Sequence, residues 1–205
     1  MKNFADLAAS RRSCHDFEPG FKLDLDLFHQ LIKTTALTPS GYNAQPWSFC
    51  LVQSQEKIKE LYEIAYQQDH ILSAGNVVIV LGDREFGVHE GDRIVSEWVE
   101  HRGFNKKQAE ALQASLKKDR PEWKKREMML RNCSLAAMSF MYAAEDAGLS
   151  TCPMMGFRQL DLKRWLELPE SLIPVMMIAV GKKSKANGEA RLPRKGVEEL
   201  VWGVL

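Results

Sequence analysis

The chain lacks the features that mark secreted, membrane-bound and metal-binding proteins. Its four cysteines form no C-x-x-C pair and have no spacing typical of metal ligands. No stretch approaches the roughly 18 consecutive apolar residues of a membrane span, and residues 1–6 lack the apolar run of a signal peptide. We therefore expect reduced thiols, no metal, no membrane partner and a cytoplasmic protein.

Charge of one sign is also lacking, as are the usual catalytic groupings. The formal net charge is +1, so no overall field favours nucleic acid as a partner. No G-x-G-x-x-G dinucleotide fingerprint occurs, and no Ser-His-Asp or paired-carboxylate constellation is evident. Cys14 and His15 are adjacent, but neighbours in sequence rarely face each other as nucleophile and base. We expect no side chain to act as catalytic acid or base.

At 205 residues the chain is long enough for one well-buried core, or two small domains at most, and its hydrophobic patterning predicts mixed helices and strands. The run 77–82 is continuously apolar and rich in β-branched residues, which is typical of a central strand covered on both faces. The apolar segment 197–204 has no evident strand partner in its own chain, so we expect it to dock on a second subunit. Helices are expected at 2–12, 24–37, 55–67, 92–102, 108–118, 127–147 and 159–168, and strands at 47–52, 77–82, 173–181 and 197–204.

Segment 38–47 is the most informative stretch of the chain. It contains two prolines, a glycine, a serine and an asparagine, which is typical of a loop. Pro46 fixes the approach to the following strand because its φ angle is locked. Asn43 and Gln45 carry carboxamides that donate and accept hydrogen bonds, which suits a planar heteroaromatic ligand with amide and carbonyl edges. On the residues alone, a structural turn before a strand is an equal alternative.

Basic residues cluster near both ends of the chain. Arg11, Arg12 and Ser13 follow the first helix and could bind a phosphate through charge-assisted hydrogen bonds; the alternative is a solvated helix end favoured by the helix dipole. In the basic tail, Pro193 beside Arg194 and Lys195 favours a fixed anchor over a solvated charge run.

A second special loop is predicted at 149–157. Pro153 and Gly156 bracket Met154 and Met155, whose backbone amides could approach a ligand closely.

Four separated features, in this order along the chain, resemble the FMN-dependent nitroreductase family. The resemblance extends over nearly the whole chain except residues 83–127. The features are Arg11-Arg12-Ser13; the segment from Pro39 to Trp47; Gly148-Leu149 followed by residues 153–157; and Val180-Gly181 followed by Pro193-Arg194-Lys195.

The resemblance implies one domain, residues 1–205, with an α+β fold in which helices flank a central, mainly antiparallel sheet. It also implies a homodimer that exchanges C-terminal strands and binds FMN at the subunit interface. His15 would face the N1–O2 edge of the flavin, where the family often has Arg or Lys, and Gln67 and His70 would stand where some members have Asn and Lys. The implied cofactor-binding residues are Arg11, Arg12, Ser13, His15, Pro39, Ser40, Gly41, Asn43, Gln45, Gln67, His70, Pro153, Met154, Met155, Gly156, Arg194 and Lys195.

Within this set, the resemblance assigns three roles. Arg11, Arg12, Ser13, Arg194 and Lys195 would hold the phosphate and ribityl chain. The loop from Pro39 to Gln45 would line the flavin from the partner subunit. The backbone around Met155 would approach flavin N5.

The implied activity is ping-pong hydride transfer from NADH or NADPH, through flavin N5, to an electron-poor nitroaromatic, quinone or enone. Two alternatives stay open: other flavin chemistry on the same fold, such as reductive dehalogenation or flavin fragmentation, and a non-catalytic flavin-binding protein. We expect residues 83–127 to form a variable helical excursion over the active site that selects the acceptor. Its aromatics Phe86, Trp98, Phe104 and Trp123 are candidates for pocket walls, although at least two should be core.

Overall fold

A four-stranded antiparallel sheet forms the centre of the molecule. The computed structural model describes residues 3–184 and 191–204. The strands lie in the order β1-β2-β4-β3, and every neighbouring pair is antiparallel. Their bounds are β1 Trp47–Val52, β2 Val77–Asp83, β3 Ser150–Met154 and β4 Leu172–Gly181. Together with the helices around it, this sheet confirms the α+β class.

Several helices begin where the sequence supplies a capping side chain. Asp24 accepts hydrogen bonds from two backbone amides at the start of α2, Ser54 caps α3, and Asn105 forms a capping box at α7. The helices are α1 Phe4–Ser10, α2 Leu25–Thr35, the 3-10 helix η1 Gly41–Asn43, α3 Gln55–Ile64, α4 His70–Ala74, α5 Phe86–His89, α6 Gly91–Arg102, α7 Lys106–Lys117, α8 Glu122–Asp146, α9 Gln159–Trp165 and α10 Val197–Leu200.

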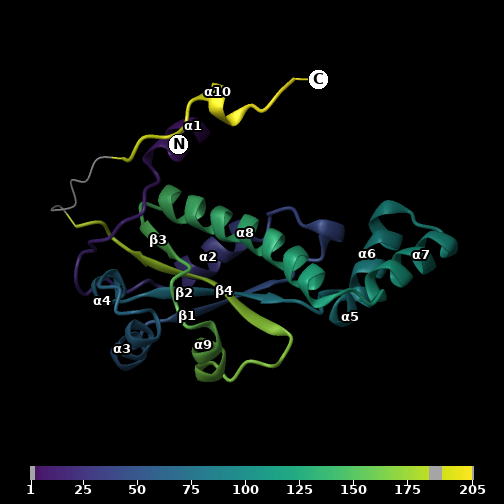
Figure 1. Ribbon diagram of the computed structural model, residues 1–205, viewed down its shortest axis with the longest axis horizontal. Coiled ribbons are helices and arrows are strands. Elements are labelled where there is room, and N and C mark those ends of the chain that lie inside the picture. The colour runs from purple at the N-terminus through teal and green to yellow at the C-terminus, as the bar shows by residue number, and fades with distance from the viewer. Residues whose placement is uncertain (1–2, 185–190, 205) are drawn as a thin grey trace.

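Helices cover both faces of the sheet, as the continuous apolar run of β2 predicts. Val77, Ile79 and Leu81 pack with α3, α4 and α9, whereas Val78 and Val80 pack with α2 and α8 (Figure 1). All five of these side chains are buried. Successive residues of β2 therefore serve two separate apolar clusters.

The long helix α8 lies across the sheet. It was expected from residue 127 but begins at Glu122, with Pro121 at its N-cap, where proline costs no helical hydrogen bond. Gly82 of β2 allows the close contact, because a Cβ there would lie 2.5 Å from the Met129 sulfur.

Two expected elements are wrong. Segment 149–157 is not a loop throughout, because Ser150–Met154 forms edge strand β3, with Pro153 on the edge where a missing donor is tolerated. The expected C-terminal strand is also absent from the described residues: Val197–Leu200 forms the short helix α10, and Val201 to Val204 belong to no strand. Apolar β-branched residues alone do not make a strand where no partner edge is at hand.

Residues 83–127 form a helical projection at one end of the sheet, with α6 and α7 packed against each other (Figure 1). The projection has its own apolar cluster, which contains Phe86 and includes Ala44 from segment 38–47. Trp98 and Phe104 pack on this cluster with their ring centroids 5.0 Å apart. Trp123 is 66% exposed. Phe86 is therefore a core residue, and the role of this projection over an active site stays a prediction.

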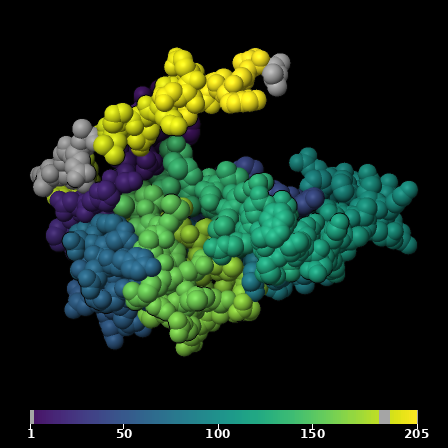
Figure 2. Space-filling view, in the orientation of Figure 1, coloured from purple at the N-terminus to yellow at the C-terminus, as the bar shows by residue number. Residues whose placement is uncertain are grey.

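The C-terminal segment forms an arm, defined here as residues 191–204. It runs beside α1, and Figure 2 shows that it stands away from the body of the molecule. Its apolar residues are exposed, with Trp202 at 96%. In the described part of the chain, no helix combines the length and apolar character needed to cross a membrane.

Candidate functional site

The two ends of the chain meet around a cavity of about 270 Å³, the arginine cavity. Arg11, Arg12, Arg191 and Arg194 line it, and no carboxylate does so among the described residues. The guanidinium group binds phosphate through paired, charge-assisted hydrogen bonds. The cavity is therefore suited to a phosphate group. Its remaining lining residues are Ser13, His15 and Leu192.

Backbone contacts hold the arginine cavity together. Cys14 N donates to Thr151 O at 3.0 Å, which joins the N-terminal segment to the outer edge of β3. Arg191 Nη2 donates to Ala9 O at 2.8 Å and to Arg11 O at 2.7 Å, so the arm is fastened to the end of α1. Arg191 was not singled out from the sequence.

Lys195 is exposed and does not line the cavity, and residues 185–190 of the basic tail lie outside the described residues.

His70 lies beside His15, with ring centroids 5.4 Å apart. His70 is the first residue of α4, and its Nε2 is buried without a hydrogen-bond partner. Burial, and then the neighbouring His15, lower the pKa of His70, whereas Asp69 raises it less strongly. His70 is thus held as a neutral imidazole next to the arginine cavity.

We expect the free protein to lose stability as the pH falls below about 6.5, the ordinary histidine pKa. The pKa of folded His70 is lowered, so the unfolded chain binds more protons in this range and stability rises with pH. His70→Gln should reduce the difference between the free energies of unfolding measured in urea at pH 5.5 and pH 7.5. His29→Gln, at an exposed position of α2, is the control. An equal pH dependence in both variants would contradict this reading.

Two loops extend this surface beyond the histidines. Tyr66 and Gln67 have left-handed φ angles of 56° and 58°, a conformation that costs non-glycine residues energy and is common at functional sites. Gln68 Nε2 donates to Gly156 O at 2.7 Å, which ties this turn to the loop after β3. A Cβ at Gly156 would lie 3.6 Å from the Gln68 amide nitrogen.

The predicted backbone residues fall at the same place. Met155 is 79% exposed and Gly156 is exposed, so their backbone is open to a ligand. Pro153 is half-buried and Met154 is buried in β3. The Gln67 side chain donates instead to Glu63 Oε2 at 3.1 Å.

Segment 38–47 holds three more left-handed residues. Tyr42, Asn43 and Gln45 have φ angles of 60°, 57° and 47°. Hydrogen bonds fix the turn: Gln45 N donates to Ser40 Oγ at 2.9 Å, and Gly41 N donates to Asn132 Oδ1 of α8 at 3.0 Å. Strain of this kind persists only where surrounding contacts determine the backbone. Segment 38–47 is therefore a loop whose conformation is fixed by specific contacts, rather than a simple connection between elements.

Helix α6 supplies the other contacts to this loop. Glu97 Oε2 accepts from Asn43 Nδ2 at 3.0 Å, Ala44 O accepts from Arg93 Nη2 at 3.1 Å, and Tyr42 O accepts from Trp98 Nε1 at 3.0 Å. The Arg93 guanidinium lowers the pKa of Glu97, which keeps its carboxylate ionised as an acceptor. The projection therefore positions the loop, a role that no sequence motif indicates.

The two groups of predicted residues lie apart within one chain. Gly41 contacts α8 at Asn132, whereas Phe4 of α1 packs on α8 at Tyr142, with ring centroids 5.3 Å apart. At 1.5 Å per residue, the ten residues from 132 to 142 span about 15 Å of helix. Figure 1 shows α1 and the arm near one end of α8 and the α6–α7 projection near the other. One chain alone does not bring Pro39 to Gln45 to the arginine cavity.

Comparison with known protein families assigns the chain to one of them. The model of the Nitroreductase family matches residues 8–182. The chain belongs to the nitroreductase family. The matched range contains both groups of candidate residues but not the arm, so Arg191, Arg194 and Lys195 lie outside it.

Comparison with individual proteins supports the assignment to the nitroreductase family. The Bacillus subtilis (strain 168) protein named "Putative NAD(P)H nitroreductase MhqN" is 32% identical and aligns over 98% of each chain. The crystal structure of the "putative nitroreductase ydfN" from Bacillus subtilis has a TM-score of 0.90 at 31% identity and covers 98% of each chain. A "putative nitroreductase in complex with FMN" from Exiguobacterium sibiricum 255-15 has the same fold, with a TM-score of 0.85 at 22% identity over 98% and 97% of the two chains.

Proposed function

We propose that two copies of this chain bind FMN at their interface and use NADH or NADPH to reduce an electron-poor nitroaromatic, quinone or enone. Family membership and the relative named as an NAD(P)H nitroreductase support an NAD(P)H-dependent oxidoreductase. The fold neighbour crystallised with FMN supports FMN as the cofactor.

The residues present fit FMN. A phosphate monoester carries a charge of about −1.5 to −2 at neutral pH, and the arginine cavity offers four guanidinium groups without an acid among the described lining residues. Beside it, the exposed backbone at Gly156 leaves room for a flat ring to approach closely, because no side chain stands there. The neutral imidazole of His70 lies between these two features.

The separation of the two groups of candidate residues within one chain is the observation that carries the proposal. Segment 38–47 has strained backbone and contacts α8 at Asn132, about 15 Å along the helix from Tyr142, on which α1 packs. The arm exposes Val197, Leu200 and Trp202, and no described residue of its own chain covers them. Large exposed apolar patches mark interaction surfaces. A partner copy would cover the arm and supply the loop to the arginine cavity.

In this assembly the protein residues bind and position FMN, and FMN supplies the hydride chemistry when it is bound. Arg11 and Arg194 hold the phosphate. The backbone of Met155 and Gly156 orients the ring edge, and loop 38–47 of the other copy excludes water from the ring. His15 and the neutral imidazole of His70 lie near the ring edge. No carboxylate or serine is required as acid or base.

The test uses the purified protein as isolated. We expect a yellow dimer that releases FMN on denaturation, bleaches when mixed with NADH or NADPH in a stopped-flow instrument, and recovers colour with a nitroaromatic or a quinone. A yellow protein that neither nucleotide bleaches would indicate a non-catalytic flavin carrier. Turnover of halogenated phenols or destruction of the flavin would indicate the other chemistries of the fold. A colourless monomer indifferent to FMN would overturn the proposal.

A further inference from the structure

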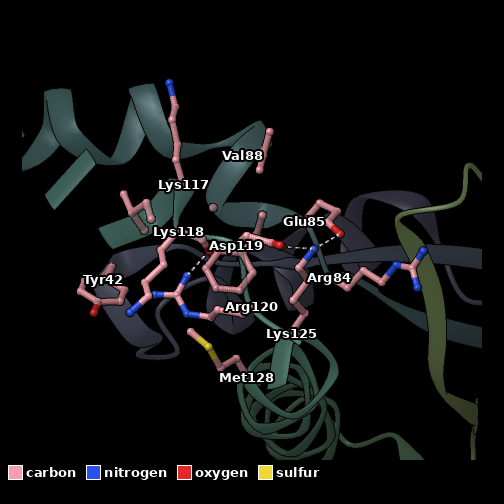
Figure 3. Close-up of a pocket in the computed structure, with 13 residues that line it drawn as sticks. Tyr42, Arg84, Glu85, Val88, Lys117, Lys118, Asp119, Arg120, Lys125 and Met128 are labelled. Carbon is pink, nitrogen blue, oxygen red and sulfur yellow. Dashed lines mark hydrogen bonds and ion pairs between the residues drawn. The ribbon is translucent and has the colours of Figure 1, made fainter. Parts of the chain in front are cut away.

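A second cavity, of about 100 Å³, lies between loop 38–47 and the α5–α7 projection. Its floor is apolar and is made by Phe86, Leu116 and Met128, and the Tyr42 side chain lines it from the loop. Lys118 and Arg120 reach it from the segment between α7 and α8 (Figure 3). None of these residues belongs to the arginine cavity, and all six lie on or beside the projection.

Most cations around this cavity already have acidic partners. Arg84 pairs with Glu122 and Glu170 at 2.9 Å each, and Lys125 pairs with Glu85 at 3.0 Å and with Asp119, which also lines the cavity, at 3.5 Å. Arg84, Glu85 and Lys125 lie on the side of the cavity away from Tyr42 (Figure 3). Lys117 pairs with Asp92 at 3.3 Å. Their charges are largely compensated.

Lys118 and Arg120 differ from these cations. In residues 3–184 and 191–204, neither side chain has a carboxylate within ion-pair distance. Arg120 donates to the carbonyl oxygens of Ser115 at 2.7 Å and Lys118 at 3.0 Å, so its guanidinium is fixed in place. Figure 3 shows the Lys118 side chain on the Tyr42 side of the cavity, where the Arg120 guanidinium also lies. Both cations line the cavity, and an anion that enters it would compensate their charges.

The volume limits what can enter. The cavity is smaller than the arginine cavity, at about 100 Å³ against about 270 Å³. We infer that it takes a single carboxylate, sulfonate or phosphate group rather than a whole nucleotide. The rest of such a ligand must lie outside, toward loop 38–47.

The loop connects this cavity to the proposed flavin site. Tyr42 lines the cavity, while its neighbours Asn43 and Gln45 belong to the set expected to line the flavin. The left-handed φ of Tyr42 and the hydrogen bond from Trp98 to its carbonyl fix the loop conformation that places Tyr42 at the cavity. A ligand with its acidic end in the cavity therefore extends past Tyr42 toward the ring.

We propose that Lys118 and Arg120 bind the acidic group of a molecule that reacts at the flavin, so that the enzyme prefers anionic substrates. This inference rests on the proposed function. The acidic group has two possible sources: a carboxylate or sulfonate on the acceptor, or the 2′-phosphate of NADPH.

The experiment measures how the FMN-loaded dimer binds pairs of ligands that differ in one acidic group. Binding of para-nitrobenzoate and para-nitrobenzamide to the oxidised protein is followed by the change in flavin absorbance, and KM is measured for both and for NADPH and NADH. We expect either nitrobenzoate or NADPH to bind more tightly than its counterpart, nitrobenzamide or NADH, which lacks the extra acidic group. Lys118→Gln should weaken binding of that anion about 10-fold and of its counterpart less than 2-fold, because hydrogen bonds to charged groups are strong.

Lys107→Gln, on an exposed position of α7, is the matched control and should change neither ligand. Arg120→Lys, which keeps the charge but loses the planar fork, should weaken the same anionic member. Selectivity for nitrobenzoate assigns the site to the acceptor, and selectivity for NADPH assigns it to the donor. A yellow dimer that reduces nitrobenzamide but shows no charge preference, or in which Lys118→Gln and Lys107→Gln behave alike, overturns this inference alone. A colourless protein overturns the proposed function instead.

Discussion

Replacing Arg11 by alanine should weaken FMN binding by about one to two orders of magnitude and leave riboflavin binding nearly unchanged. Arg11 lines the arginine cavity, and charge-assisted hydrogen bonds contribute about 1.5–3 kcal/mol each, where 1.4 kcal/mol corresponds to a factor of ten. Riboflavin has no phosphate, so it should not use this group. Quenching of flavin fluorescence by the apoprotein measures both affinities.

The control for this variant is Arg126→Ala, which removes the same charge from an exposed position of α8. Arg194→Ala should behave like Arg11→Ala, because Arg194 lines the same cavity from the arm. If the Arg11 and Arg126 variants bind FMN equally well, or if riboflavin affinity falls in parallel with FMN affinity, the cavity is not the phosphate site.

Much of the fold follows from residue periodicity. The β2 run predicts a strand covered on both faces, and its residues do alternate between two clusters. Short elements escape this reasoning. Helices α4 and α5 have only 5 and 4 residues, too few for a period of 3.6 to be recognised. Strand β3 contains Pro153, which favours a loop when only local sequence is considered.

The candidate site, like the fold, follows partly from local sequence motifs and partly from contacts between residues far apart in the chain. The positions of Arg11, Ser13, His15 and Gly156 follow from motifs, and the structure places them around one surface. The contacts that shape loop 38–47 do not follow from motifs.

Arg93, Glu97 and Trp98 lie about fifty residues from the loop groups they bind, in the stretch 83–127 that contains none of the four sequence features named above. Arg191 bonds to Ala9 and Arg11 from the other end of the chain. Such pairs are set by tertiary packing, which a single sequence does not show.

A mixed dimer made from two chains with different defects should recover one tight FMN site. Arg11→Ala damages the phosphate side, and the double variant Asn43→Ala/Gln45→Ala damages the loop side. In a mixed dimer, the intact Arg11 of one chain meets the intact loop of the other. One interface site is therefore undamaged, while the second carries both defects, because a two-fold dimer repeats each contact.

The mixed dimers are prepared by co-expression with two different affinity tags and sequential purification. Calorimetric titration with FMN should then give about one tight site per dimer, whereas each defective homodimer should bind at least 10-fold more weakly at both sites, by the hydrogen-bond energies above. A site contained within one chain predicts no recovery at all, since every chain in the mixture carries a defect. The mixed dimer therefore distinguishes a site formed by two chains from a site contained within one chain. Within one chain, the loop contacts α8 at Asn132 and α1 contacts it at Tyr142, about 15 Å apart along the helix, so recovery is the expected result.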